Sequence, residues 1–184
     1  MATSSTNQAQ VTIFDPVIYH GGTGDFGYNS RVDFGFIGDS VTFQYTQNVA
    51  EYNSGIPKSL RKALKVEESA MFKFDLMETS LGSMQSALNR QSADLISTSF
   101  LKIGGDSEVT VLANVHVEGT DDQAKKIRIL FFKGIVKEVG EFNIDDNFMK
   151  IPMTITAVAD LTRARGDQLC RIMRETAGAW TFDA

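Results

Sequence analysis

Alternation of apolar and polar side chains with a period of two residues is the feature that most constrains the fold of this chain. The pattern covers residues 40–49, 66–76, 108–117 and 150–158. Because successive side chains of a strand point to opposite faces, each segment is expected to form a strand with one apolar and one wet face. A more continuous apolar run at residues 127–132 predicts a strand covered on both faces. We therefore expect a mainly β protein.

The first two of these segments are long. Strands of that length span roughly 35 Å at about 3.3 Å per residue, which suggests a large sheet or a barrel wall. Between them, residues 51–65 contain Asn53-Ser54-Gly55 and Pro57, residues typical of turns. The segment is too long for a tight hairpin, so we expect a long structured loop between two long strands.

Three further segments depart from the alternation. Residues 79–91 have apolar residues at helical spacing and predict an amphipathic helix. Residues 161–184 are expected to form a C-terminal extension with a short helix, packed on the domain or on a neighbouring subunit. Residues 1–10 are rich in Ser, Thr and Gln and lack the pattern of a secretory signal, so we expect a flexible tail before a single β domain at residues 11–160.

Composition argues against several classes of function. A net charge of -5 is unfavourable for gripping nucleic acid, which needs clustered Lys and Arg. One cysteine, Cys170, excludes an internal disulfide and a zinc site built from cysteines, and its expected role is that of a small buried apolar group. No run approaches the 18 apolar residues of a transmembrane helix, so no membrane insertion is expected and the chain is placed in the cytosol during synthesis.

Motifs for catalysis or cofactor binding are weak. Residues 22–27 match the dinucleotide pattern G-x-G-x-x-G, but the residues after it predict a loop and a strand, whereas that pattern requires a helix. His20 and His116 lack partners at metal-ligand spacing, and the expectation for His116 is a satisfied or solvated side chain. We expect no catalytic, metal or cofactor site.

Three pairs of neighbouring carboxylates have simpler explanations than acid–base chemistry. Asp121/Asp122 and Asp145/Asp146 stand beside turn residues and predict hairpin turns. The third pair, Glu67/Glu68, belongs to a change of charge along the chain. Residues 58–65 carry four cations and no acid, and the strand after them is net acidic. This segregation fits either a solvated surface with chance clustering or basic loop tips that dock on acidic patches of another subunit.

Four consecutive segments carry a resemblance to a known family. They are the strand at residues 41–49, the segment Glu51-Tyr52-Asn53-Ser54-Gly55-Ile56-Pro57-Lys58, the strand that begins Lys65-Val66-Glu67-Glu68, and the helix expected next. In these segments the sequence resembles the major tail tube proteins of tailed bacteriophages. The resemblance covers residues 11–160 and includes no catalytic signature.

The resemblance implies a β-sandwich or small barrel with one flanking α-helix, whose long hairpin strands join a ring-wide barrel. It also implies homo-hexameric rings that stack into a hollow tube in the virion tail, with transient, non-specific passage of DNA. Sheath, tape-measure and tail-terminator proteins are further expected partners. The chain would be a structural virion protein made in the host cytoplasm, not an enzyme, and would need no cofactor.

Two sets of residues receive roles on this interpretation. The bore of the tube is expected to be lined by Thr42, Gln44, Thr46, Glu67, Ser69, Lys73 and Asp75. The contact with the next ring is expected from the loop residues Asn53, Gly55, Pro57, Lys58, Arg61, Lys62 and Lys65. Glu68 falls on the apolar side of its strand, which leaves the register open.

Other functions remain alternatives. The inner tube of a contractile secretion or injection system would have the same mechanics and would pass protein. A monomeric β-sandwich binding module would be expected to expose a row of aromatic residues, and a single tryptophan, Trp180, weighs against it. A dinucleotide enzyme would need a helix after Gly27.

Overall fold

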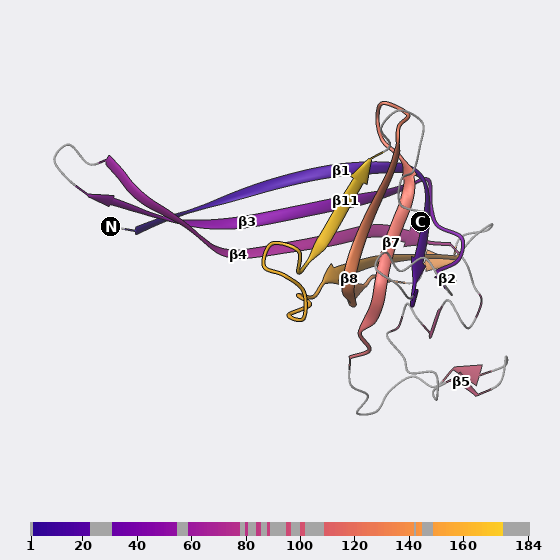
Figure 1. The fold of residues 1–184 in the computed structure, drawn as a ribbon. Coiled ribbons are helices and arrows are strands. Elements are labelled where there is room, and N and C mark those ends of the chain that lie inside the picture. The colour runs from indigo at the N-terminus through magenta and orange to yellow at the C-terminus, as the bar shows by residue number, and fades with distance from the viewer. Residues whose placement is uncertain are drawn as a thin grey trace.

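The computed structural model is mainly β and is built around one closed barrel (Figure 1). The structure describes residues 2–22, 31–54, 59–77, 80, 84–85, 88, 95–96, 100–101, 109–141, 143–144 and 149–174. The long strands are β1 (Ala2–His20), β3 (Ser40–Ser54), β4 (Ser59–Leu76), β7 (Leu112–Thr120), β8 (Lys126–Val139) and β10 (Met149–Ala157). The shorter strands are β2 (Val32–Asp33), β5 (Leu95–Ile96), β6 (Phe100–Leu101), β9 (Asn143–Ile144) and β11 (Cys170–Arg174).

Six antiparallel strands close the barrel in the order β8-β7-β1-β3-β4-β10, and β10 returns to pair with β8. β11 lies beside the first part of β8, and β2 and β9 pair with β1 and β10. The alternating apolar residues point into the barrel and form one core. Phe72 and Phe131 stack at its centre, with ring centroids 3.9 Å apart.

Several expected strands are confirmed. β3, β4 and β10 place most of the predicted apolar residues in the core, but Val66 of β4 is 69% exposed, and Thr154, expected on the wet face of β10, is buried. β8 is covered on both faces: Ile129 and Phe131 lie in the core, and Leu130 and Phe132 pack outside with Met173 of β11. The hairpin turn at Asp121 is also present, because its Oδ1 accepts hydrogen bonds from the backbone N–H groups of Gln123 and Lys125.

β1, β3 and β4 extend beyond the barrel as a three-stranded arm, with the N-terminus in its distal part (Figure 1). We call residues 2–9, 45–54 and 59–70 the arm. Residues 2–10, expected to be a flexible tail, are paired strand and form part of β1. The expected long loop is also wrong: β3 continues to Ser54 and β4 starts at Ser59, so that most of residues 51–65 is strand.

β1 changes its partner strand where the arm meets the barrel. Pairing with β3 runs to Phe14, and pairing with β7 begins at Phe14 and continues from Val17 after an irregularity between these two residues. Asp15 in that irregularity has a left-handed backbone (φ 47). Gly119 of β7 permits the close approach, because a Cβ there would lie 2.5 Å from both Ile13 Cγ2 and the Phe14 carbonyl oxygen.

The two predicted helices, at residues 79–91 and in the C-terminal extension, have different outcomes. Most of residues 79–91 lies outside the described residues, although two helical hydrogen bonds, Met84 N to Ser80 O and Leu88 N to Met84 O, are described. The prediction of a short helix in the C-terminal extension is wrong for its described residues, 161–174. Turns lead into β11, which packs on β8 of the same chain. Residues 175–184 and Asp145/Asp146 lie outside the described part.

Candidate assembly surface

In the described part of the chain, the arm has two edges without a partner strand. β4 pairs with β10 only from Met71 onward, and β1 pairs with β7 only from Phe14 onward. Among the described residues, no strand lies on the outer side of residues 59–70 or 2–13. Each edge is roughly 40 Å long at about 3.3 Å per residue. Such edges present rows of unpaired N–H and C=O groups, which readily pair with a strand of another chain.

The two faces of the arm sheet differ in chemistry. One face continues from the barrel interior, and we call it the core face. The opposite face continues from the outside of the barrel and carries mainly polar side chains, so we call it the polar face. Its described members in the arm are Gln8, Thr46, Asn48, Ala50, Tyr52, Lys62, Leu64, Glu67 and Ser69, and it continues over the barrel wall with Gln10, Thr12, Thr42, Gln44, Met71, Lys73 and Asp75.

All seven residues expected to line a bore lie on the polar face. The strand register sets Thr42 beside Lys73 and Thr46 beside Ser69. Glu67 faces Asn48, whose side-chain amide donates a 3.0 Å hydrogen bond to it. The structure therefore gathers these residues on one surface, half-exposed or exposed, while their role in a bore stays a prediction.

Glu68 lies on the core face without an error of register. It stands opposite Gln47, where the barrel interior ends and the arm begins. Lys65 Nζ donates to its Oε2 at 2.6 Å and Tyr45 Oη donates at 2.8 Å. The hydrogen bond from Lys65 lowers the pKa of Glu68, and burial together with the same carboxylate raises the pKa of Tyr45 to about 12.

A β-bulge at Val66 makes the Lys65–Glu68 ion pair possible. Asn48 pairs with Glu67 but Val49 pairs with Lys65, so Val66 is the extra residue. Residues three apart in a regular strand point to opposite faces, and the bulge returns Lys65 to the face of Glu68. The sequence offered no signal of this bulge. It also gives Lys65 a partner in its own chain, which weakens its expected role in contact with the next ring.

Three of the remaining contact residues lie at or near the distal end of the arm. Asn53 belongs to β3, and Arg61 and Lys62 to β4; Lys62 is exposed. Gly55, Pro57 and Lys58 lie outside the described residues. Exposed apolar side chains accompany Lys62 in this region, namely Tyr52, Leu60 and Leu64.

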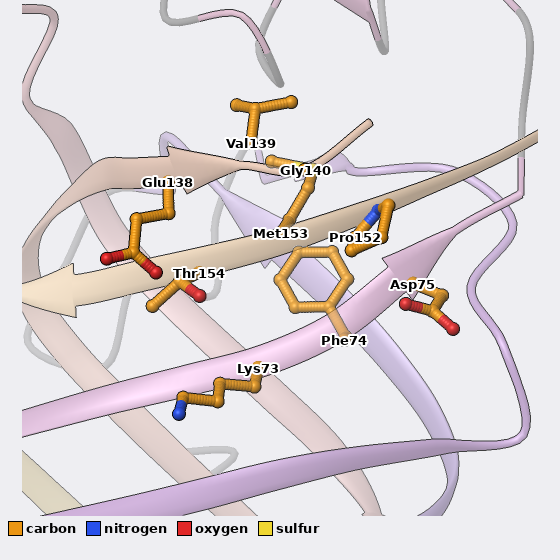
Figure 2. A pocket seen from close by; sticks show the side chains of 9 residues that line it. All are labelled: Lys73, Phe74, Asp75, Glu138, Val139, Gly140, Pro152, Met153 and Thr154. Atoms are coloured by element: carbon orange, nitrogen blue, oxygen red, sulfur yellow. The ribbon is translucent and has the colours of Figure 1, made fainter. Parts of the chain in front are cut away.

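The polar face continues onto β10 and β8 as a shallow depression of about 430 Å³. Figure 2 shows Lys73, Thr154 and Glu138 there, and the register places them side by side on three adjacent strands. Asp75 adds a second carboxylate. One cation between two acids makes this region mixed in charge and slightly acidic.

A second polar cluster is buried on the outside of the barrel wall. Glu118 Oε1 accepts a hydrogen bond from Arg31 Nη1 at 2.8 Å and lies 3.0 Å from Arg128 Nε. His116 is fully buried beside them, with Nε2 3.3 Å from Arg31 Nη1 and Nδ1 3.3 Å from the Asn114 carbonyl oxygen. These contacts fit a neutral imidazole protonated on Nδ1.

Burial, followed by the charges of the two arginines, lowers the pKa of His116 to about 4. The Arg31 guanidinium also stacks on the Tyr19 ring at 3.8 Å. The cluster therefore fastens the segment before β2 to β7 and β8. His116 has satisfied hydrogen bonds, as expected, but no sequence pattern indicated that two arginines share one carboxylate beside it.

The other sequence candidates lie apart from the arm edges. Cys170 is partly buried against the core, which raises the pKa of its thiol to about 11. His20 packs edge-to-face on Phe34, and burial lowers its pKa. Most of the G-x-G-x-x-G segment lies outside the described residues, and the segment described from Arg31 to Asp39 includes β2 and no helix.

Within the described residues, no group of three His, Cys, Asp or Glu side chains is placed to hold a metal ion. The same part of the chain contains no helix whose length and apolar character would let it cross a membrane. Comparison with protein-family models and with curated proteins gives no match for this chain.

Proposed function

We propose that this chain is a structural subunit that assembles through its arm into rings, and that the rings stack into a hollow tail tube through which DNA passes. The observation that supports the proposal is the three-stranded arm with two open edges and one polar face. An isolated ribbon of this kind leaves backbone groups of both edges unpaired, and closure into a ring removes such edges.

The position of the barrel favours one orientation of the arm in a ring. The barrel closes over the core face, because Phe43 and Phe72 of the same strands point into its interior. In a small ring, the barrels of the copies fit only on the outside of the ring. The polar face then turns toward the axis and lines the bore, including Thr42, Glu67 and Lys73.

The number of strands gives a bore of useful size. Three arm strands from each of six copies, the number that the tail tube resemblance implies, make a barrel of eighteen strands. At about 4.8 Å between strands and a tilt of about 40°, its backbone diameter is roughly 35 Å. Barrels of about this strand number leave an aqueous channel.

The chemistry of the polar face suits passage of a polyanion. Protein cations that neutralise phosphates release counterions, and this release makes DNA adhere. From Asn48 toward the barrel the face is dominated by hydroxyl and amide groups, and Lys73 is outnumbered there by Glu67 and Asp75. Nearer the distal end of the arm, the same face carries Lys62. A lining of this kind solvates DNA and provides few sites that would hold it.

Sedimentation velocity and negative-stain electron microscopy of the purified chain test the proposal. Six-fold rings or tubes are expected, and a chain that stays monomeric at all concentrations and salts refutes it. A variant lacking residues 2–10 removes the open edge of β1 and leaves Ile13 of the core, so it should fold and fail to assemble. Leu161→Ser, at a residue 80% exposed outside the arm, is the control and should assemble normally.

A further inference from the structure

We propose that neighbouring copies join by parallel strand pairing, with the open edge of β1 (residues 2–13) against the open edge of β4 (residues 59–70) of the next copy. The inference rests on the proposed function and adds to it the two partner strands of the ring interface and their direction. The partner is a second copy of this chain.

The direction follows from the topology of the arm. β1 and β4 flank β3 and are both antiparallel to it, so they run in the same direction. Rotation about a ring axis that runs along the arms preserves that direction, so β1 of one copy meets β4 of the next in parallel. Pairing of two identical edges about a two-fold axis would be antiparallel.

The two edges also match in extent. At the distal end Ala2, Tyr52 and Lys62 are aligned across the three strands, and near the barrel Ala9, Tyr45 and Ala70 are aligned. Heterologous pairing of β1 with β4 therefore covers both edges with one kind of contact. A two-fold contact between β1 strands alone would leave both β4 edges open.

The edges differ in how they are protected. Residues 2–13 contain no charged residue and no proline, and their pairing with β3 is regular. Charge, proline and bulges are the common devices that stop an edge from pairing, so this edge is unprotected.

The β4 edge carries charged residues and bulges, which the β1 edge lacks. Exposed charges lie along it at Lys62, Lys65, Glu67 and Glu68, and its register shifts twice against β3. A uniform polar strand specifies its register weakly, and bulges fix the register of their neighbours. Pairing of β1 with β4 therefore gives one defined register, whereas pairing of β1 with another β1 would slip.

Cysteine cross-linking between two assembled chains tests the direction. In a Cys170→Ser background, one chain carries a single cysteine on β4, at Leu64 or Ser69. The other chain carries one on β1, at Ser4, Gln8 or Thr12. The two chains are mixed in equal amounts, assembled and oxidised, and cross-linked dimers are measured on a non-reducing gel.

Parallel pairing predicts a shift of about four residues in the preferred partner. Leu64 and Ser4 both align with Ala50, and Ser69 and Gln8 both align with Thr46. Moving the β4 cysteine from Leu64 to Ser69 should therefore move the strongest β1 partner toward the barrel, whatever the stagger between copies.

Two results overturn the inference while rings still form. One is a shift of the preferred β1 partner toward the N-terminus, and the other is efficient cross-linking of a β1-cysteine chain with itself. Absence of rings refutes the proposed function as well. Electron cryo-microscopy of tubes of the unchanged chain gives a second reading, because antiparallel strands at the subunit boundary would contradict the proposal without any substitution.

Discussion

Protonation of His116 should destabilise the barrel in mildly acidic solution. The folded-state pKa is about 4, below the ordinary value of 6.5. The unfolded chain therefore binds a proton as the pH falls below about 6.5, while the folded chain does not. The neutral form is favoured in the fold, so stability is intact above pH 6.5 and is lost progressively down to pH 4.

The magnitude follows from the two pKa values. Between pH 7.5 and pH 5 the linkage relation gives a loss of about 2 kcal/mol in the free energy of unfolding. The full difference approaches about 3 kcal/mol below pH 4. Arg31 and Arg128 oppose a charged imidazole, and Glu118, 3.5 Å from Nε2, already serves both of them.

Urea denaturation followed by far-UV circular dichroism, at a protein concentration where single copies predominate, measures this loss. His116→Gln removes the titrating group, and its stability should vary about 2 kcal/mol less than that of the unchanged chain over this pH range. His20→Gln is the comparison variant, since it leaves the cluster in place and measures separately the contribution of His20, whose pKa is also lowered by burial. Equal pH dependence in the unchanged chain and His116→Gln would refute the reasoning.

Three further changes have definite expected outcomes. Glu118→Gln leaves the nearly buried Arg128 without its carboxylate and should lower the free energy of unfolding by about 3 kcal/mol in the same urea assay. Gly119→Ala places a methyl group 2.5 Å from the β1 backbone and should cost several kcal/mol, with a lower Tm, while an unchanged Tm would show that β1 shifts freely. Glutamate at Arg61 and Lys62 of the arm, together with Lys58, should leave the circular dichroism unchanged and shorten tubes in micrographs, and tubes of normal length would remove the docking role expected for these residues.

The barrel could be predicted where side chains decide the structure. Alternation identified β3, β4 and β10 because their inner residues, such as Phe43 and Phe72, are buried together. The arm could not be predicted in this way. Residues 2–10 and the strand ends near Ser54 and Ser59 have little apolar alternation, and their strand structure depends on backbone pairing across β3.

Spacing alone misled the interpretation of the C-terminal extension. Leu169, Ile172 and Met173 fit a helical face, but Met173 is buried and Ile172 is 55% exposed in a short strand. A five-residue strand is too short for periodicity to separate the two structures. The buried cluster was equally hidden, because Arg31, Glu118 and Arg128 come together only through pairing of strands distant in sequence.

The arm also bears on how assembly would start. Beyond Tyr45 the ribbon contributes little to any apolar core, since its described side chains are half-exposed or exposed. Three strands without a buried face have modest stability of their own, and strand pairing with a neighbouring copy would supply much of the stability of the arm. If the chain assembles as proposed, the first few copies must order their arms with little help, whereas later copies add to a formed template. Growth should accordingly show a lag and a threshold concentration, and short preformed pieces should abolish the lag.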